Sequence, residues 1–207
     1  MGLRESKKAQ ARQTISNVAT ALFIEKGFDA VSVADVAVAA NVSKMTVFNY
    51  FPRKEDLFLD RGDEARALVR SAIIDRARGR SAVDACIDLA KRLVAEGHPF
   101  AKWSTGTEHY FRMIRESASL MARVREHREL VEDEIASALI ESAKTRKGDA
   151  TAQVLAVAMF AAWRSAYVST TAVRHAGKRG DALGKVFLRA LDGALEPVRR
   201  AAKGTPY

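Results

Sequence analysis

Cysteine, long apolar runs and targeting signals are scarce or missing in this sequence, and each absence excludes a class of protein. The single cysteine, Cys86, cannot form a disulfide within the chain, which is typical of a reducing compartment. No apolar run approaches the roughly 20 residues that a membrane-spanning helix needs. Residues 1–12 are polar and lack the apolar core of a signal peptide, so we expect the protein to stay in the cytoplasm.

Enzyme signatures are missing as well. The chain contains no His-Glu-x-x-His zinc motif, no Gly-x-Ser-x-Gly nucleophile turn and no Cys-x-x-Cys pair. Gly184-Lys185 lacks the earlier glycine and the following Ser or Thr of a phosphate-binding loop, and the four histidines show no metal-ligand spacing. The pair Glu108-His109 has no identifiable nucleophile. We therefore expect a protein that is not an enzyme and that binds no cofactor or metal.

Positive charge is what the chain has in excess, because 34 Lys and Arg stand against 25 Asp and Glu, a net charge of +9. A basic protein usually meets a polyanion such as nucleic acid or an anionic membrane surface, although a basic surface also serves solubility alone. Residues 1–54 hold eight basic and four acidic side chains, a net +4, and the remaining +5 lies in the rest of the chain. The excess is spread out, so charge alone does not locate a DNA-binding face.

Apolar residues recur with the period of amphipathic helices, strand-like alternation is absent, and the chain has only four prolines. We therefore predict an all-α fold of about nine helices. The predicted helices cover residues 5–26, 33–40, 44–50, 53–78, 82–96, 104–117, 119–146, 150–176 and 181–202. We expect helix 53–78 to be continuous and rigid. The last two helices are joined by a short loop, so we expect them to form an antiparallel pair.

Residues 32–57, SVADVAVAANVSKMTVFNYFPRKEDL, carry the pattern of a helix-turn-helix. Ser32 and Asp35 form a Ser-x-x-Asp capping pattern that begins the first helix. Asn41 enters a left-handed turn more readily than most residues, and the apolar Val42 is expected to fill the gap between the helices. Ser43 caps the second helix and leaves its first amides available to solvent or to a phosphate.

The second helix, 44–50, is expected to have an inner face at Val47, continued by Phe51, and an outer face that contacts DNA. Asparagine pairs bidentately with adenine, and threonine bonds a base or touches a thymine methyl, so we hypothesise base contacts for Asn49 and Thr46. Lysine and tyrosine side chains suit phosphates. The predicted outer face consists of Lys44, Met45, Thr46, Asn49 and Tyr50.

Two cations begin the next helix. Pro52 ends helix 44–50, and Arg53-Lys54 then oppose the dipole of the following helix, at a cost of a few tenths to about 1 kcal/mol each. A docked phosphate would reverse this cost, so we hypothesise that Lys54 anchors the DNA backbone. The alternative is that both side chains are solvated and have no partner. The candidate DNA-binding residues are Ser32, Ser43, Lys44, Met45, Thr46, Asn49, Tyr50 and Lys54.

The segment 42–57 resembles the DNA-binding motif of the TetR/AcrR-type transcriptional regulator family, where the turn reads Val-Ser and the second helix ends in Tyr-x-x-Phe-Pro-x-Lys. Phe48 stands where an aromatic residue is usual, and the Phe-Pro-x-Lys sequence follows at residues 51–54. Ala21-Leu22-Phe23 and Lys26-Gly27-Phe28 extend the similarity, so that it covers about residues 12–60. Asn41 and Met45 replace positions that are often glycine, so base preference cannot be copied from relatives.

The resemblance implies a helix-turn-helix DNA-binding domain at residues 1–53 and a helical effector-binding and dimerisation domain at residues 54–207. It also implies a ligand-responsive regulator, commonly a repressor, that binds a palindromic operator as a homodimer. A small molecule would release it, and an apolar pocket suits a lipophilic or acyl-type compound. A ligand that favours a wider spacing of the two recognition helices would weaken DNA binding, with helix 53–78 as the lever.

The last two helices are the implied dimer face, because they carry more large apolar residues than one stripe needs. The predicted interface residues are Phe160, Tyr167, Val186, Phe187, Leu191 and Leu195. The middle helices are the implied site of the effector pocket. Its predicted lining residues are Cys86, Leu89, Leu93, Trp103, His109, Phe111, Met113, Met159 and Trp163. The alternative for both sets is ordinary core packing, and for the dimer face we expect a division between core and interface.

Two other classes of protein remain as alternatives to a sequence-specific regulator. A non-specific DNA-coating protein would show little sequence preference and a weak response to ligands, and the defined recognition helix argues against it. An enzyme is the other alternative, and the missing signatures argue against that.

Overall fold

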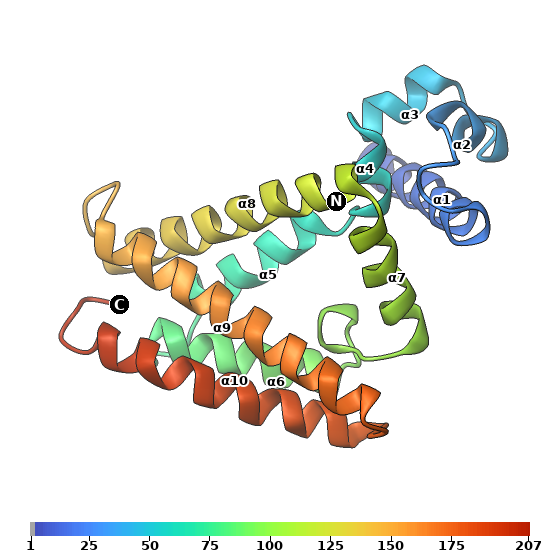
Figure 1. Cartoon of the computed structure of the whole chain (residues 1–207). Coiled ribbons are helices and arrows are strands. Elements are labelled where there is room, and N and C mark those ends of the chain that lie inside the picture. Colours follow the sequence, from blue (N-terminus) through green and yellow to red (C-terminus); the bar gives the residue numbers. More distant parts are fainter. Residues whose placement is uncertain (1–2) are drawn as a thin grey trace. The chain divides into compact units, whose positions relative to one another are not determined.

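The structure, a computed structural model, describes residues 3–207, with side chains described from residue 5 onward. The described chain is helical and has no strand, so the predicted all-α fold is confirmed (Figure 1). None of the helices in this range is long and apolar enough to cross a membrane. The elements are α1 (Leu3–Lys26), α2 (Val33–Ala39), α3 (Lys44–Tyr50), α4 (Lys54–Phe58), α5 (Gly62–Ile74), α6 (Ala82–Ala95), the 3-10 helix η1 (Pro99–Ala101), α7 (Thr105–Glu116), α8 (Ala118–Ala143), α9 (Ala150–His175) and α10 (Asp181–Ala202).

The helices form two compact units, each with its own hydrophobic core. The N-terminal unit comprises the chain up to Gly62 together with His109–Glu126, and the C-terminal unit comprises Asp63–Glu108 and His127–Tyr207. The first turns of α8 therefore belong to the N-terminal unit, and the rest of α8 belongs to the C-terminal unit. The functional division expected between residues 53 and 54 stays a prediction.

The core of the N-terminal unit is built by α1–α4 and is completed by a segment that is distant in the sequence. Phe23 of α1, Val36 of α2 and Val47 of α3 are fully buried in this core. Met113 and Ile114, from the last turn of α7, belong to the same core. The helix-turn-helix thus packs against residues that follow it much later in the chain.

The prediction of one continuous helix over residues 53–78 is wrong, because the structure has α4 and α5 with a break between them. Asp60 lies in this break. Its backbone carbonyl accepts a hydrogen bond from Arg12 Nη2 at 3.1 Å, and its carboxylate accepts one from the hydroxyl of Ser16. These two bonds join the break to α1. The described residues therefore form ten α-helices instead of about nine.

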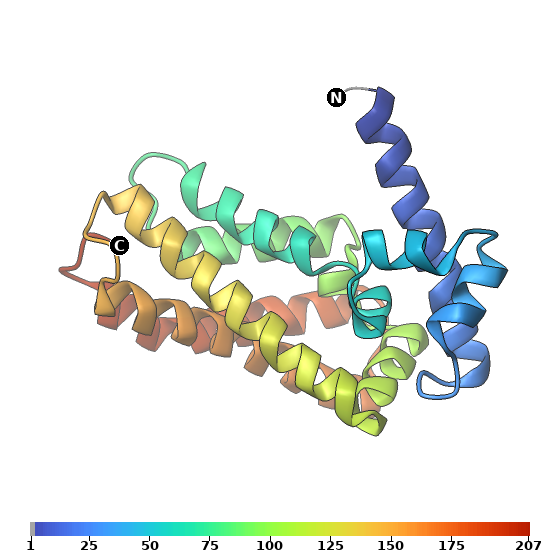
Figure 2. The same cartoon turned by 90° about the horizontal axis from the view of Figure 1, so that it is seen from above.

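The remaining helices lie close to their predicted bounds. α9 and α10 run side by side in opposite directions, as predicted, and residues 176–180 join them (Figures 1 and 2). Gly184 of α10 permits close packing on α6, since a Cβ atom there would lie 2.5 Å from Val94 Cγ1. A Cβ atom at Gly193 would meet no heavy atom within 4 Å. One of the two glycines of α10 is therefore required by packing within the chain.

Candidate nucleic-acid interface

Both helices of the motif begin at serine caps, as the sequence predicted. Ser32 Oγ accepts a hydrogen bond from the backbone N–H of Asp35 at 3.2 Å, and the Asp35 carboxylate accepts bonds from the Ser32 hydroxyl and backbone N–H at 2.7 and 2.8 Å. These two bonds lower the pKa of the Asp35 carboxyl. Ser43 Oγ accepts a bond from the backbone N–H of Thr46 at 3.0 Å. Each helix start is therefore defined by side chains three residues apart.

The turn between the helices has the geometry that the sequence predicted. Asn41 adopts the left-handed conformation, with φ at 52°. Val42 donates its backbone N–H to the carbonyl of Ala37 at 3.0 Å, and its half-buried side chain packs on the core. Ala37 is itself buried, so its small side chain lies where α2 meets α3.

α3 has the predicted inner and outer faces. Val47 and Phe51 are buried in the core of the N-terminal unit. Phe48 also reaches solvent, at 38% exposure, with Lys44 Nζ 5.8 Å from the centroid of its ring. The five predicted outer residues are the exposed Lys44, Met45 and Asn49 and the half-buried Thr46 and Tyr50.

The hydroxyl of Thr46 already has a partner within the motif, because it lies 2.8 Å from Ser43 Oγ. Ser43 and Thr46 therefore hold the start of α3 together. Asn49 has no such engagement among the described residues, and its side chain is exposed. The base-contact roles given to Asn49 and Thr46 stay predictions, and the geometry leaves Asn49 the freer of the two.

Arg53 and Lys54 have partners inside the N-terminal unit, so the alternative of two solvated, unpartnered cations is wrong. Arg53 donates two hydrogen bonds to the carboxylate of Glu126 on α8, at 2.9 and 3.1 Å. Lys54 Nζ lies 4.3 Å from the centroid of the Phe28 ring and 3.4 Å from the carbonyl of Asp29. Partial burial lowers the pKa of the Lys54 ammonium. A phosphate contact by Lys54 stays a prediction.

Glu126 belongs to a small ion-pair network that sequence reasoning missed. Arg123 of α8 donates to the Asp56 carboxylate from Nε at 2.7 Å and also pairs with Glu126. Hydrogen bonds from Arg123 and Arg53 lower the pKa of the Glu126 carboxyl. The network ties the start of α8 to the start of α4. Glu126 stands 73 residues after Arg53, so no local pattern pointed to it.

A groove of about 340 Å³ runs between α1 and α3 on the same unit. Thr46 and Tyr50 line it from α3, and Lys7, Gln10 and Thr14 line it from α1. Sequence reasoning missed these α1 residues. Their spacing of three and four residues, which places them on one helix face, was the available signal.

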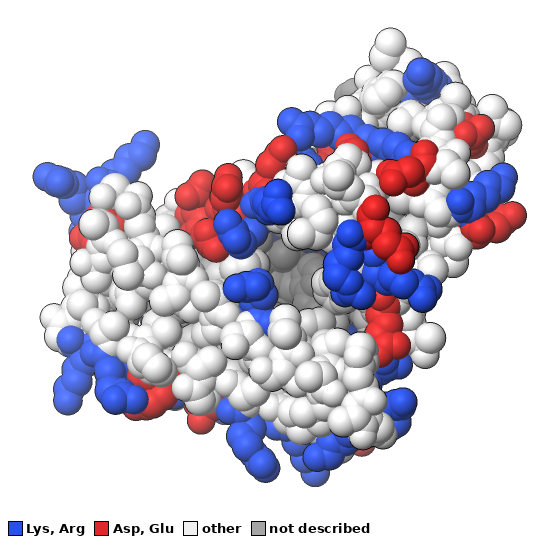
Figure 3. Space-filling model, viewed as in Figure 1, with Lys and Arg blue, Asp and Glu red and all other residues white. Residues whose placement is uncertain are grey.

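On the surface drawn in Figure 3, charge does not mark a DNA-binding face. Figure 3 shows Lys and Arg interspersed with Asp and Glu over the surface that it draws. Along the sequence, too, the excess charge is not confined to one segment, with +4 in residues 1–54 and +5 in the rest. The evidence for a nucleic-acid interface therefore comes from the helix-turn-helix geometry.

The predicted effector-pocket residues are divided between the two units. Met113 is buried in the core of the N-terminal unit, and its assignment to an effector pocket stays a prediction. His109 and Phe111 also belong to the N-terminal unit. The predicted pocket residues in the C-terminal unit are Cys86, Leu89, Leu93, Trp103, Met159 and Trp163.

Aromatic side chains cluster in the core of the C-terminal unit. The ring of Phe187 lies 5.1 Å from that of Trp103 and 5.2 Å from that of Trp163, between centroids. Tyr167 lies 5.2 Å from Trp103 and donates its hydroxyl to the carbonyl of Lys102 at 3.2 Å. Burial raises the pKa of Tyr167 to about 12. Trp103 Nε1 is buried and has no hydrogen-bond partner among the described residues.

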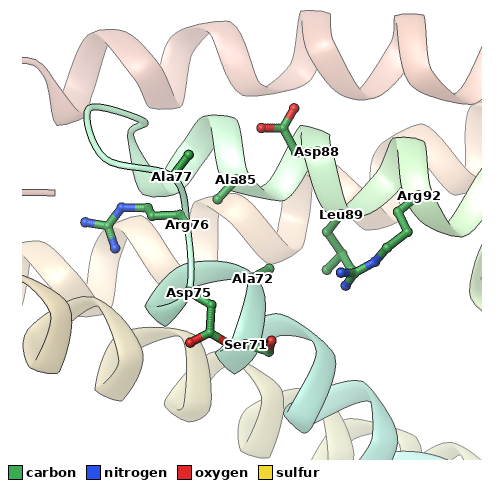
Figure 4. Close-up of a pocket in the computed structure, with 9 residues that line it drawn as sticks. All are labelled: Ser71, Ala72, Asp75, Arg76, Ala77, Ala85, Asp88, Leu89 and Arg92. Atoms are coloured by element: carbon green, nitrogen blue, oxygen red, sulfur yellow. Dashed lines mark hydrogen bonds between the residues drawn. The ribbon is translucent and has the colours of Figure 1, made fainter.

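A cavity of about 190 Å³ lies between the end of α5 and α6 in the C-terminal unit (Figure 4). Leu89 lines this cavity and is also one of the predicted pocket residues. Its other lining residues include the charged Asp75, Arg76, Asp88 and Arg92. Charged and apolar side chains both line this cavity, whereas the resemblance implied an apolar pocket.

Three of the predicted dimer residues are core residues of the single chain. Phe187, Leu191 and Leu195 of α10 are each 0% exposed, so their side chains offer no area to a partner in this conformation. The other three, Phe160, Tyr167 and Val186, are half-buried. The exposed apolar residues of α9 that sequence reasoning missed are Val154, Val157 and Val168.

Comparison with known protein families gives a match for part of the N-terminal unit. Residues 15–60 match the family model described as bacterial regulatory proteins, tetR family, which confirms the resemblance found in the sequence. No curated protein matches the chain.

Solved structures share the fold at low sequence identity. A putative TetR-family transcriptional regulator from Mesorhizobium loti is 22% identical, with a TM-score of 0.55 over 90% of this chain and 96% of that one. Thermus thermophilus FadR, a TetR-family repressor solved in complex with lauroyl-CoA, is 24% identical, with a TM-score of 0.53 over 89% and 93%. Salmonella enterica GusR is 16% identical, with a TM-score of 0.52 over 90% and 96%.

Proposed function

We propose that this chain, whose residues 15–60 form a tetR-family DNA-binding segment, is a transcriptional repressor that binds a palindromic operator as a homodimer and is released by a small molecule. The observation that carries the proposal is the outer face of α3. It places the exposed Lys44, Met45 and Asn49 on a capped recognition helix whose opposite side is buried. Such a helix fits the major groove, where base pairs are distinguished. The protein would act in the cytoplasm, as a binding protein and not an enzyme.

Phosphate contacts would come from residues around α3. Lys44 and the half-buried Tyr50 flank the recognition face, and the α1 groove adds Lys7 and Gln10 beside it. Backbone contacts of this kind supply affinity and register, while base contacts supply specificity. Lys54 would contribute through an ammonium that Phe28 already holds in place.

The homodimer would form through the outward face of α9. Val154, Val157 and Val168 are 68%, 50% and 59% exposed, and the exposed Ala161 lies between them. Their spacing places these four residues, which we call the α9 valine row, on one side of the helix. A second copy would bury the row, and a two-fold dimer would place two recognition helices about 34–36 Å, or a multiple of that, apart.

The effector would be an acyl-type or otherwise lipophilic molecule that binds in the C-terminal unit. The aromatic cluster supplies apolar surface, and the unpaired Trp103 Nε1–H supplies a buried donor for a carbonyl oxygen. An unsatisfied buried donor costs about 1–3 kcal/mol, which a ligand acceptor would relieve. The acyl-CoA complex of the Thermus thermophilus relative is consistent with this chemistry.

The ligand signal would pass along α8. The break at residues 59–61 interrupts the helix that the sequence suggested as the lever. α8 is continuous, and its first turns carry Arg123 and Glu126, which bond to Asp56 and Arg53 beside the recognition helix. A ligand that shifts α8 would therefore bias the DNA-binding segment by population shift.

Selection of bound DNA from a random pool tests the proposal. We expect an enriched palindromic sequence, and a gel shift with that sequence should resist competition by unrelated DNA. Equal competition by unrelated DNA would instead support the non-specific coating protein. Acyl-CoA compounds and free fatty acids should then be screened for release of the bound operator. A failure of all ligands would remove the effector from the proposal and leave the operator binding intact.

A further inference from the structure

The solvent-facing side of α3 has a definite centre. Successive residues of an α-helix are rotated by about 100°, and the fully buried Val47 marks the inner side of α3. The direction opposite Val47 falls between Met45 and Asn49, which are separated by one helical turn. Lys44 and Phe48 flank this centre on one side, and Thr46 and Tyr50 flank it on the other.

Met45 is 69% exposed at this centre, although it is a large apolar residue. The groups around it are less available to a base. The hydroxyl of Thr46 lies 2.8 Å from Ser43 Oγ, and the Phe48 ring, 38% exposed, has the Lys44 ammonium beside it. Met45 and Asn49 are therefore the two side chains of α3 best placed to contact base edges.

The chemistry of methionine restricts what it can contact in the major groove. A thioether is a weak acceptor and has no donor, so it does not compete for the hydrogen bonds of base edges. The apolar feature of the major groove is the 5-methyl group of thymine. A flexible apolar side chain that covers this methyl group removes both from water, which is favourable.

We propose, on the basis of the proposed function, that Met45 is a specificity-determining residue that selects thymine in each operator half-site by covering its 5-methyl group. Asn49 lies one turn away, with about 5–6 Å between the two Cβ atoms, which corresponds to one or two base-pair steps of about 3.4 Å. Asn49 pairs with adenine. The centre of each half-site is therefore an A·T-rich step, in which Met45 covers a thymine methyl and Asn49 bonds an adenine nearby.

Deoxyuridine isolates the methyl group, because it keeps the hydrogen-bonding edge of thymine and lacks only the 5-methyl. The operator selected from the random pool is remade with each thymine replaced in turn by deoxyuridine, and affinity is measured by fluorescence anisotropy. At one position per half-site, we expect the wild-type protein to bind about fourfold more weakly, the effect of one buried methyl group. Replacement in both half-sites should weaken binding about fifteenfold.

Protein variants assign the effect to Met45. Met45→Ala should bind the thymine and deoxyuridine operators equally, whereas Met45→Leu should keep the preference for thymine. Leu130→Ala is the matched control, since it removes another exposed apolar side chain, 41% exposed, from the C-terminal unit. That variant should keep the full preference. Melting temperatures of the Met45 variants should match the wild type, because the side chain lies outside the core.

The results separate this inference from the proposed function. If no sequence is enriched from the pool, the proposed function fails. If an operator is bound tightly but no deoxyuridine position weakens binding, or if Met45→Ala keeps the sensitivity, the role of Met45 is wrong while operator binding stands.

Discussion

Replacing Val157 of α9 by glutamate is expected to separate the proposed homodimer into monomers. The α9 valine row is exposed in the single chain, and Val157 lies between Val154 and Ala161 along it. A glutamate at this position stays solvated in the monomer, so the fold should be unaffected. In a dimer built on this row, the carboxylate would be buried against the partner.

The size of the effect follows from the exposure of Val157. Complete burial of a valine side chain is worth about 1.5 kcal/mol or more. Val157 is 50% exposed, so its burial by a partner contributes about 0.75 kcal/mol per protomer and about 1.5 kcal/mol per dimer. Glutamate loses this contribution and adds the desolvation of two unpaired carboxylates, which costs several kcal/mol. The dissociation constant should therefore rise at least about 100-fold, which corresponds to about 2.7 kcal/mol.

Sedimentation velocity over a range of protomer concentrations measures this constant. Val38→Glu is the matched control, because Val38 is 81% exposed on α2 in the N-terminal unit and the chemical change is the same. It should leave the constant unchanged. An unchanged constant for Val157→Glu, or equal dissociation by Val38→Glu, would refute the α9 valine row as the interface. A wild-type protein that is monomeric at every concentration would refute the homodimer itself.

Three further predictions concern Lys54, the two glycines of α10 and Cys86. Lys54→Ala should weaken binding evenly across DNA sequences and reduce the salt slope of a dimer by about 2, and an altered sequence preference in the selection assay would contradict its backbone role. Gly184→Ala should destabilise the fold by about 1–3 kcal/mol in urea unfolding, because its Cβ would lie 2.5 Å from Val94. Gly193→Ala faces open space and should stabilise it by about 0.5–1 kcal/mol, so equal effects of the two would contradict the packing argument. Burial raises the pKa of the Cys86 thiol from 9.0 to about 12, so the folded state holds the proton more tightly. Ionisation of this thiol should therefore leave the free energy of unfolding unchanged below about pH 9 and lower it as the pH rises towards 12. Thiol reagents should label the native protein slowly near pH 8 but rapidly in urea. Rapid native labelling would contradict the burial of the thiol.

The helix-turn-helix could be predicted from the sequence because its determinants are local. Ser32 and Asp35, like Ser43 and Thr46, make their hydrogen bonds across three residues, so the bonds can be inferred from adjacent letters. Asn41 adopts the left-handed conformation, which the asparagine side chain tolerates more readily than most others. The periodic burial of Val47 follows in the same way from the helix repeat.

The sites beyond the helix-turn-helix were predicted less well, because periodicity identifies an apolar helix face but not the residues that pack against it. Leu191 and Phe187 have the spacing of an interface stripe, but the chain itself buries them. Met113 has the same apolar character as a pocket residue, yet it lies in the core of the N-terminal unit. The exposed valines of α9 carried less weight in the sequence because larger apolar residues surround them.

By itself, the sequence determined the all-α class, the caps and turn of residues 32–51, and the antiparallel pairing of α9 and α10. These features rest on helix periodicity, on hydrogen bonds across a few residues and on a short connection. The tertiary structure alone decided the break at Asp60, whose partners lie 44 and 48 residues earlier, and the pairing of Arg53 with Glu126, 73 residues later. Such contacts depend on how separate helices pack, and no local pattern encodes which distant polar group meets which.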